Sequence, residues 1–236
     1  MLATRTGPGE LLVKRRHWLS GCTLAASSGL AAFAPRTLLA AVGSGQGQDA
    51  RSASQFLPLF PLGVVAFPGE RVLLHVFEPR YKQLIAECAD SGITFGIVTI
   101  VPGGASSIGT EMKLERIVRT QDSGAMDVAT RGIRVFRLQR FQRVVEGKLY
   151  SGGLVSFEKN DPRVEPGIQD ALVQLINRRH SPMASREQLA APYAENLSFL
   201  IGHDAGMSQA QELQLLTLSV ESDRQAYLLQ HLLRAQ

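Results

Sequence analysis

The spacing of apolar residues changes along the chain and divides it into three parts. Residues 43–55, GSGQGQDARSASQ, are small and polar with no apolar periodicity, which is typical of a linker. From residue 56 to about 162, short β-favouring runs alternate with Gly and Pro, and from about 167 apolar residues recur at helical spacing. The pattern predicts a leader or disordered extension and linker over residues 1–55, a β-rich subdomain over 56–162 and a helical bundle over 163–236.

The β-rich region begins with two strongly predicted strands that flank one helix. Residues 72–77 and 93–100 are rich in Val, Ile, Leu and Phe. Between them, Pro79 suits the first turn of a helix and Gly92 suits its end. One helical face is then formed by Tyr81, Leu84, Ile85 and Cys88. Further along, the pattern predicts a mobile loop at 102–109 and short strands around 112–120, 125–130, 133–141 and 149–157.

The last part of the chain predicts about four helices that pack on one another. Three S-x-x-Q sequences are typical of capping boxes at helix starts, namely Ser185 with Gln188, Ser208 with Gln211, and Ser222 with Gln225. Leucine-rich helical faces follow each of them. Because short helices need tertiary burial to be stable, we expect these faces to pack against each other and not to form a zipper with a partner.

The first 50 residues resemble an export leader in some respects. Arg15-Arg16 precedes a modestly apolar stretch, as in a twin-arginine signal, but Pro35 follows directly on the best cleavage position, Ala32-Phe33-Ala34. The apolar stretch is too short and too weak for a membrane span, so we expect no integral membrane association. The prediction is a cytoplasmic protein, with export through residues 14–43 as the alternative. An unstructured tail or an upstream start-site error are further alternatives for this region.

Charge is concentrated in the same leader. The chain of 236 residues has a net charge of +4, but residues 1–50 hold five basic and two acidic side chains, which leaves 20 basic and 19 acidic ones in the rest. A nearly neutral body gives little steering toward polyanions, which argues against nucleic acid as a partner. With 44% hydrophobic and 19% charged residues, the chain can bury a substantial core. The body has one thiol, Cys88, and therefore no internal disulfide.

The motifs that an enzyme would need are missing from the sequence. It contains no phosphate-binding glycine loop, no H-E-x-x-H and no cysteine pair at metal-ligand spacing. Residues 105–109, ASSIG, come within one residue of a nucleophile elbow, but a flexible loop fits their context better. His75 lies in an apolar strand and Cys88 on an apolar helical face, where structural roles are expected. We predict no catalytic residue, no metal and no cofactor.

One polar series leaves a nucleic-acid alternative open. Five arginines recur every three residues, at Arg131, Arg134, Arg137, Arg140 and Arg143. Side chains alternate between the two faces of a strand, so this series does not form one stripe. Interleaved Phe136 and Phe141 are what a single-stranded nucleic-acid platform would also use. Paired, solvated strand faces remain the favoured interpretation.

Residues 57–81, LPLFPLGVVAFPGERVLLHVFEPRY, closely resemble the start of the LON substrate-binding domain, the N-terminal domain of the ATP-dependent protease Lon. The resemblance continues through Phe95-Gly96-Ile97-Val98, Ile108-Gly109-Thr110 and Gly132 with Arg134 and Phe136, and fades after about 165. Its most specific part is a set of motif residues that we expect to mark the fold: Pro58, Pro61, Pro68, Gly69, His75, Phe77, Glu78, Pro79, Arg80 and Tyr81.

The resemblance implies an α+β fold, a PUA-like β pseudobarrel with one early helix followed by a C-terminal helical bundle. In such a fold Pro58, Pro61 and Pro68 are expected to fix turns, Gly69 to permit a sharp bend, and Glu78 and Arg80 to form a local ion pair or cap. No ATPase or protease module follows in this chain, so the activity of Lon cannot be carried over to it.

The functional expectation is a stand-alone, non-enzymatic module that binds polypeptide. Its partners would be unfolded or partly unfolded polypeptides with exposed apolar segments, or one dedicated protein partner. Binding is expected in a groove of the β unit or at its junction with the bundle, but the sequence does not identify the groove residues. The alternative is an RNA-binding PUA-like domain.

Overall fold

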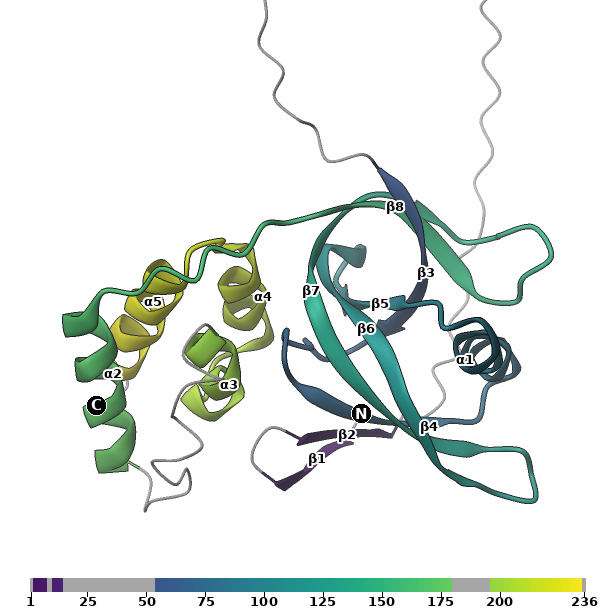
Figure 1. Cartoon of the computed structure of the whole chain (residues 1–236), viewed down its shortest axis with the longest axis horizontal. Coiled ribbons are helices and arrows are strands. Elements are labelled where there is room, and N and C mark those ends of the chain that lie inside the picture. Colours follow the sequence, from purple (N-terminus) through teal and green to yellow (C-terminus); the bar gives the residue numbers. More distant parts are fainter. Residues whose placement is uncertain (1, 8–9, 15–53, 180–195, 235–236) are drawn as a thin grey trace, which may run out of the picture.

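The computed structural model describes residues 2–7, 10–14, 54–179 and 196–234 (Figure 1). The strands are β1 (Leu2–Gly7), β2 (Glu10–Lys14), β3 (Gln55–Leu62), β4 (Arg71–Val76), β5 (Phe95–Val101), β6 (Gly104–Thr120), β7 (Met126–Gln142) and β8 (Ser151–Phe157). The helices are α1 (Pro79–Ser91), α2 (Pro166–Arg179), α3 (Leu197–Ile201), the short 3-10 helix η2 (His203–Ala205), α4 (Gln209–Thr217) and α5 (Glu221–Arg234).

The strands form one mixed sheet that closes on itself. Its order is β1-β2-β4-β7-β6-β5-β3-β8, and a further pairing of β7 with β8 closes a ring. The long strand β7 makes this possible, because its first half pairs with β4 and its second half with β8. Figure 1 shows the resulting barrel beside the C-terminal helices, with an extended segment leading from β8 to α2. This is the α+β pseudobarrel followed by a helical bundle that the sequence predicted.

Glycines make room for an aromatic side chain inside the barrel. Phe136 of β7 is fully buried, together with Leu57, Leu59, Val98 and Val155. A Cβ atom added to Gly96 would lie 2.6 Å from the Phe136 ring, and one added to Gly109 would lie 2.7 Å from it. No real side chain tolerates such distances, so both neighbouring strands need glycine where they pass this ring.

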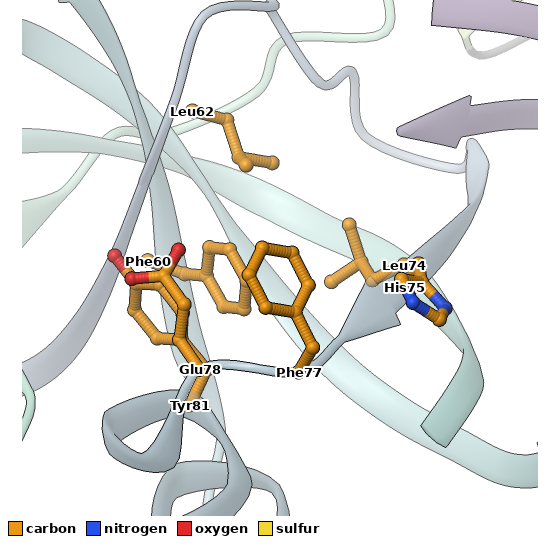
Figure 2. Close-up of a pocket in the computed structure, with 7 residues that line it drawn as sticks. All are labelled: Phe60, Leu62, Leu74, His75, Phe77, Glu78 and Tyr81. Atoms are coloured by element: carbon orange, nitrogen blue, oxygen red, sulfur yellow. The ribbon is translucent and has the colours of Figure 1, made fainter. Parts of the chain in front are cut away.

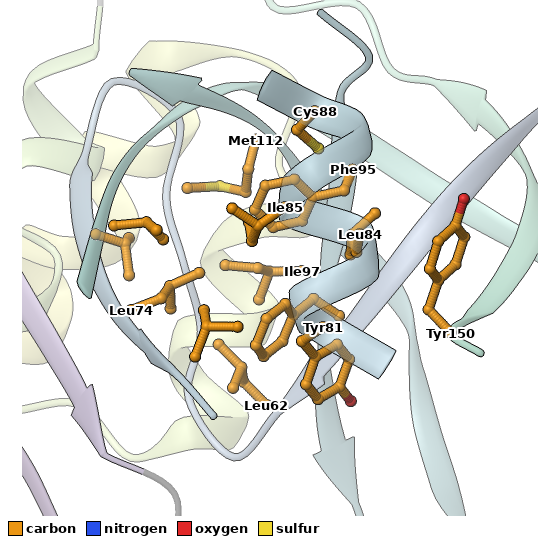
Figure 3. Packing of buried hydrophobic residues seen from close by; sticks show 14 of the residues in the cluster. Leu62, Leu74, Tyr81, Leu84, Ile85, Cys88, Phe95, Ile97, Met112 and Tyr150 are labelled. Atoms are coloured by element: carbon orange, nitrogen blue, oxygen red, sulfur yellow. The ribbon is translucent and has the colours of Figure 1, made fainter. Parts of the chain in front are cut away.

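Helix α1 covers one side of the barrel and completes its largest apolar cluster (Figure 3). Tyr81, Leu84, Ile85 and Cys88 are its buried residues, as their spacing predicted. The helix begins at Pro79 and ends at Gly92, which has a φ of 67° and donates its N–H to the Cys88 carbonyl oxygen at 3.1 Å. Tyr81 stacks on Phe60 of β3, with ring centroids 3.8 Å apart, and thereby ties the helix to the barrel.

A second apolar cluster joins the barrel to the C-terminal helices. It combines Val65, Phe67 and Ile108 from the β-rich part with buried residues of the described helices after β8: Leu172, Leu175, Leu197, Phe199, Ile201, Ala205, Leu215, Leu216, Leu228 and Leu232. Most leucines of these described helices therefore pack inside the molecule. Because one cluster includes residues from both parts, the boundary near residue 162 divides the chain but not its core.

Residues 2–7 and 10–14, inside the segment expected to be a leader or disordered extension, form a hairpin whose second strand, Glu10–Lys14, pairs with β4. Two other local predictions were wrong. Most of the loop expected at 102–109 is the start of β6, since Ala105 pairs with Ile100. The strands expected at 125–130 and 133–141 are one strand, β7, which runs through Gly132.

The three predicted capping boxes had different outcomes. The box at Ser208 and Gln211 is confirmed at the start of α4, with both of its reciprocal hydrogen bonds formed. Ser222 instead lies inside α5, and the Gln225 side chain donates to Glu221, so that prediction was wrong. Ser185 and Gln188 lie outside the described residues.

Candidate functional site

The motif prolines occupy two different environments. Pro58 and Pro61 lie inside β3, so the prediction that they fix turns was wrong. Pro58 is opposite Gly152 of β8, and Pro61 is opposite Val98 of β5. Strand β3 pairs with β8 up to Leu59 and with β5 from Leu59 onward. Each proline therefore lies in a half of β3 that has a neighbouring strand on one side only. A residue without an N–H is tolerated there because no second neighbour needs the donor.

Pro68 and Gly69 form the expected sharp turn. The Glu70 N–H donates to the Phe67 carbonyl oxygen at 3.2 Å, and Gly69 has a φ of 80°. The turn is bound to β7 by two backbone hydrogen bonds of 2.9 Å between Gly132 and residues 69 and 70. A Cβ atom on Gly132 would lie 2.2 Å from the Phe67 carbonyl oxygen, so only glycine permits this approach.

The second half of the motif surrounds a small pocket at the start of α1 (Figure 2). Phe77 and Tyr81 line it together with Phe60, Leu62, Leu74, His75 and Glu78. Arg80 Nε donates to Glu78 at 2.9 Å, which gives the expected ion pair, whereas Glu78 makes no side-chain cap. The pocket has room for about one water molecule, so it is not a ligand site as it stands.

His75 is held by a carboxylate. Its Nδ1 lies 2.7 Å from Oδ1 of Asp127, which is its partner across the β4–β7 pairing. Such a pair could orient a general base, but no residue that lines the adjacent pocket carries a hydroxyl or thiol nucleophile other than the Tyr81 phenol. The contact fits the structural role expected for this histidine.

The candidate binding site is a groove where the barrel meets the helices. Its cavity volume is about 60 Å³, against about 10 Å³ for the pocket at the start of α1. On one side it is lined by Pro68, Ile133, Arg134, Val135, Glu158, Lys159 and Asn160, and on the other by Asn196, Phe199, Leu216, Thr217, Leu218, Ser219 and Arg224. Ile133 is 44% exposed. Together with Val135, Leu216 and Leu218 it gives the groove an apolar lining flanked by polar groups.

A buried ionic network fixes the helical wall of this groove. Arg224 is 1% exposed and Glu221 is fully buried, and Arg224 Nη2 lies 2.8 Å from Glu221 Oε2. Glu221 also accepts hydrogen bonds from the N–H and hydroxyl of Ser198, while Arg224 donates to Asn160 in the segment after β8 and stacks over Phe199. Every strong donor and acceptor of the pair has a partner, which a buried charge requires.

A second ionic contact holds the barrel against the helices from the other side. His203 lies between two carboxylates, with Nδ1 2.7 Å from Glu212 of α4 and Nε2 3.2 Å from Glu70 of the Pro68-Gly69 turn. Burial opposes protonation of His203, but the hydrogen bonds to Glu212 and Glu70 outweigh it and raise its pKa from 6.5 to about 9. His203 is therefore a cation at neutral pH and donates from both nitrogens.

The arginine series is largely paired within the sheet. Arg131, Arg134 and Arg137 donate to Glu115, Glu111 and Glu158, respectively. Arg134 also lies over the Phe157 ring, 3.5 Å from its centroid. The arginine side chains of these pairs are about half exposed, in line with the solvated strand faces that the sequence favoured, although Glu111 is buried. They leave only Arg140 and Arg143 of the series without an ion pair to a described residue.

The remaining candidates for chemistry have structural roles. Ser106 is buried, and its hydroxyl donates to the Ile108 carbonyl oxygen and accepts the Thr99 N–H. Burial raises the pKa of the Cys88 thiol to about 12, which keeps it protonated. Within the described ranges, no three His, Cys, Asp or Glu side chains are placed to hold a metal ion.

Comparison with known proteins identifies the family. Residues 56–234 match the substrate-binding domain of the ATP-dependent protease La (LON). The chain belongs to the LON substrate-binding domain family. No curated protein matches the chain.

Two solved structures have the same fold as this chain. A Lon N-terminal domain protein from Xanthomonas campestris is 29% identical, with a TM-score of 0.60, and the match covers 75% of this chain and 98% of that one. The N-terminal domain of the Mycobacterium avium complex Lon protease is 14% identical, with a TM-score of 0.61 and coverage of 77% and 100%, which supports the fold alone. No helix in the described part of this LON-domain chain is long and apolar enough to span a membrane.

Sequence reasoning found the family motif but not the groove. The motif residues build the barrel wall and the start of α1, and of them only Pro68 lines the groove. The groove residues come from six separate segments, and no local pattern connects them. A visible signal was overlooked in Glu221 and Arg224, whose i, i+3 spacing places a pair of opposite charges amid the apolar positions of the last helix.

Proposed function

We propose that this LON-domain protein is a polypeptide-binding module that recognises exposed apolar segments of client proteins in the groove between barrel and helices. It acts by binding and carries out no catalysis of its own, and it does so in the cytoplasm. Export through residues 14–43 stays the alternative for its location. The observation that carries the proposal is the groove itself, which presents a half-exposed Ile133 in a substrate-binding family.

The chemistry of the groove suits an apolar segment of a few residues. Ile133 and Val135 offer apolar area on the sheet side, and Leu218 offers it on the helical side. Burying apolar area gives about 25 cal/mol per Å², so apolar contact and not a strong polar anchor is expected to provide most of the binding free energy. Asn160, Asn196 and Ser219 at the groove supply amide and hydroxyl groups for the backbone of a bound segment.

The direct test is fluorescence anisotropy of a labelled, permanently unfolded polypeptide titrated with the full chain at low and moderate salt. We expect saturable binding that weakens little with salt, because apolar burial and not charge provides the free energy. Replacing Ile133→Asp places a charge in the groove and is expected to weaken binding about tenfold, which corresponds to about 1.4 kcal/mol.

A matched substitution separates the groove from general surface effects. Val118→Asp changes another exposed aliphatic side chain of the sheet, far along the β6–β7 hairpin, and is expected to leave the affinity within twofold. Equal loss in both variants, or no binding by the wild type, would contradict the proposal. Binding of labelled RNA with a steep salt dependence would instead support the nucleic-acid alternative.

A further inference from the structure

Two strand edges lie outside the closed ring, one on the second half of β6 and one on the outer side of β4. They differ in how well they are protected against the addition of another strand. Beyond Met112, strand β6 pairs only with β7, which leaves its other edge free. This edge contains register shifts between Leu114 and Arg116 and between Ile117 and Arg119. Bulges and cationic side chains along an edge are the usual means of preventing a further strand from adding.

The outer edge of β4 has fewer of these protections, since its single arginine, Arg71, is at the first position and is ion-paired with Glu115. Its pairing with β7 runs without a register shift from Arg71 to Val76, so the strand is regular along its length. Its sequence, RVLLHV, contains no proline and four aliphatic residues. A regular, apolar edge strand is the kind to which another strand adds readily.

That edge is occupied by another part of the same chain. Strand β2 pairs in parallel with β4, with Glu10 opposite Arg71, Leu11 opposite Val72, Leu12 opposite Leu73 and Val13 opposite Leu74. Figure 1 shows the β1–β2 hairpin alongside β4, at the side of the barrel away from β8. Forty residues of chain lie between Lys14 and Gln55, so the pairing is not imposed by a short connection.

We propose that the outer edge of β4 is a strand-addition site for extended polypeptide, and that Glu10–Lys14 of the same chain is its resident occupant. The N-terminal segment competes with external segments for this edge, and backbone hydrogen bonds provide most of the interaction, as in other strand-addition complexes. Because the occupant is tethered, its effective concentration at the β4 edge is up to about millimolar. An external segment must compete with it and binds only when the tethered segment is released.

The register defines the chemistry of a suitable partner. The occupant presents three aliphatic, strand-compatible residues, Leu11 to Val13, between an acidic and a basic residue. Its acidic residue is opposite Arg71 in the backbone register. We infer that the edge takes short extended segments with an acidic residue followed by about three aliphatic ones.

Hydrogen exchange of the full-length wild type tests the occupancy first. Alternate backbone amides of residues 71–74 face the outer edge, and the remaining ones face β7. If β2 occupies the edge, both sets are protected from exchange. Exchange of the outward amides at the rate of unstructured peptide would overturn the proposal, whatever any variant does.

A double variant of the full chain then opens the site. Successive N–H groups of a strand point to opposite sides, so one of Leu11 and Leu12 points its N–H toward β4. Replacing both, Leu11→Pro and Leu12→Pro, therefore removes a donor to β4 whichever of the two it is. The barrel is expected to stay folded, because β4 keeps its pairing with β7. Gln46→Pro, in the segment between Lys14 and Gln55, is the matched control and is expected to behave as wild type.

The competition is measured with a labelled peptide that has the sequence of residues 9–16, GELLVKRR. We expect saturable binding to the double variant, at least tenfold weaker binding to the wild type and the Gln46→Pro control, and none by a peptide with proline at both leucine positions. Failure of the peptide to bind a folded double variant, or equal binding to all three proteins, would overturn the proposal.

The strand-addition site does not rest on the groove proposed above. The peptide titration uses a segment of this chain and contains no unfolded client, and Ile133→Asp is expected to leave it unchanged. Conversely, loss of the anisotropy signal with unfolded polypeptide would leave the peptide result intact. The two proposals therefore fail separately.

Discussion

At the scale of single residues, polar side chains of this LON-domain protein connect its parts. His203 links the Pro68-Gly69 turn to α4 through Glu70 and Glu212, and Arg224 links α5 to the segment after β8. The contacts of His203 with Glu70 and of Arg224 with Asn160 join residues far apart in sequence. Arg224 and Glu221 are fully buried and His203 is 19% exposed, so removing one partner leaves a charge with little access to water.

We expect the stability of the protein to fall as the pH rises through about 9. His203 has a pKa of about 9 in the folded state against 6.5 for an ordinary histidine, so its contribution is complete below about pH 6.5 and is lost as the pH rises through 9. A shift of this size corresponds to roughly 3 kcal/mol. Urea denaturation between pH 6 and 10 measures the effect, and His203→Gln is expected to remove this pH dependence.

Other groups also titrate over this range, but they are common to both proteins. The difference between wild type and variant therefore isolates the histidine. A constant difference in the free energy of unfolding from pH 6 to 10 would show that the ion pairs with Glu70 and Glu212 do not stabilise the junction.

Gly132→Ala is expected to destabilise the protein by about 1–3 kcal/mol, the range for overpacked sites. The added methyl group meets the Phe67 carbonyl oxygen at 2.2 Å, which forces the turn away from β7. Gly167→Ala is the matched control, because its Cβ would meet nothing within 4 Å and alanine favours the helix in which it lies. Urea denaturation of both variants checks the prediction, which fails if the two are equally stable.

At the scale of elements, the sequence pattern predicted those helices and strands that depend on local interactions. The residues of α1, its buried face and its final glycine followed from spacing alone, as did β4 and β5 within two residues. The start of β6 was missed because its glycines and serines favour a loop, whereas pairing with β5 outweighs that preference. Strand β2 was missed because its partner is about 60 residues away.

Helix α5 depends on its ion pair, and the prediction concerns Arg224. Arg224→Met leaves Glu221 buried without its cation, which typically costs about 3–5 kcal/mol. Arg163→Ala provides the comparison, since it removes an ion pair with Asp161 in which Arg163 is 78% exposed, and we expect no measurable change. The denaturation midpoints of both variants test this prediction, and we expect a lower midpoint for Arg224→Met only. Similar midpoints would mean that the buried pair contributes little to holding α5.

At the scale of the whole molecule, the barrel and the bundle share a core. Val65, Phe67 and Ile108 of the β-rich part pack in one cluster with the buried residues of α2 to α5. Separating the parts at residue 162 would expose apolar surface on both. The groove proposed for client binding lies along this shared boundary, so its shape depends on the boundary staying closed.

We therefore expect the barrel and the C-terminal helices to unfold together in one step. Calorimetry of the full chain should show a single transition whose calorimetric and van't Hoff enthalpies agree. A fragment ending at residue 162 is expected either to remain unfolded or to aggregate. Two resolved transitions, or a soluble and folded fragment, would show that the barrel is stable without the helices.

The closure of the ring also sets an order for folding during synthesis. Gln55 pairs with Val155, which is made 100 residues later, whereas β6 and β7 are neighbours in the chain and can pair as a hairpin early. Contacts of such long sequence separation form slowly. Until β8 leaves the ribosome, the nascent chain holds an open sheet with the apolar residues of β3 uncovered. During that interval, the uncovered apolar residues of β3 are exposed to aggregation, which is the situation in which nascent chains need chaperones.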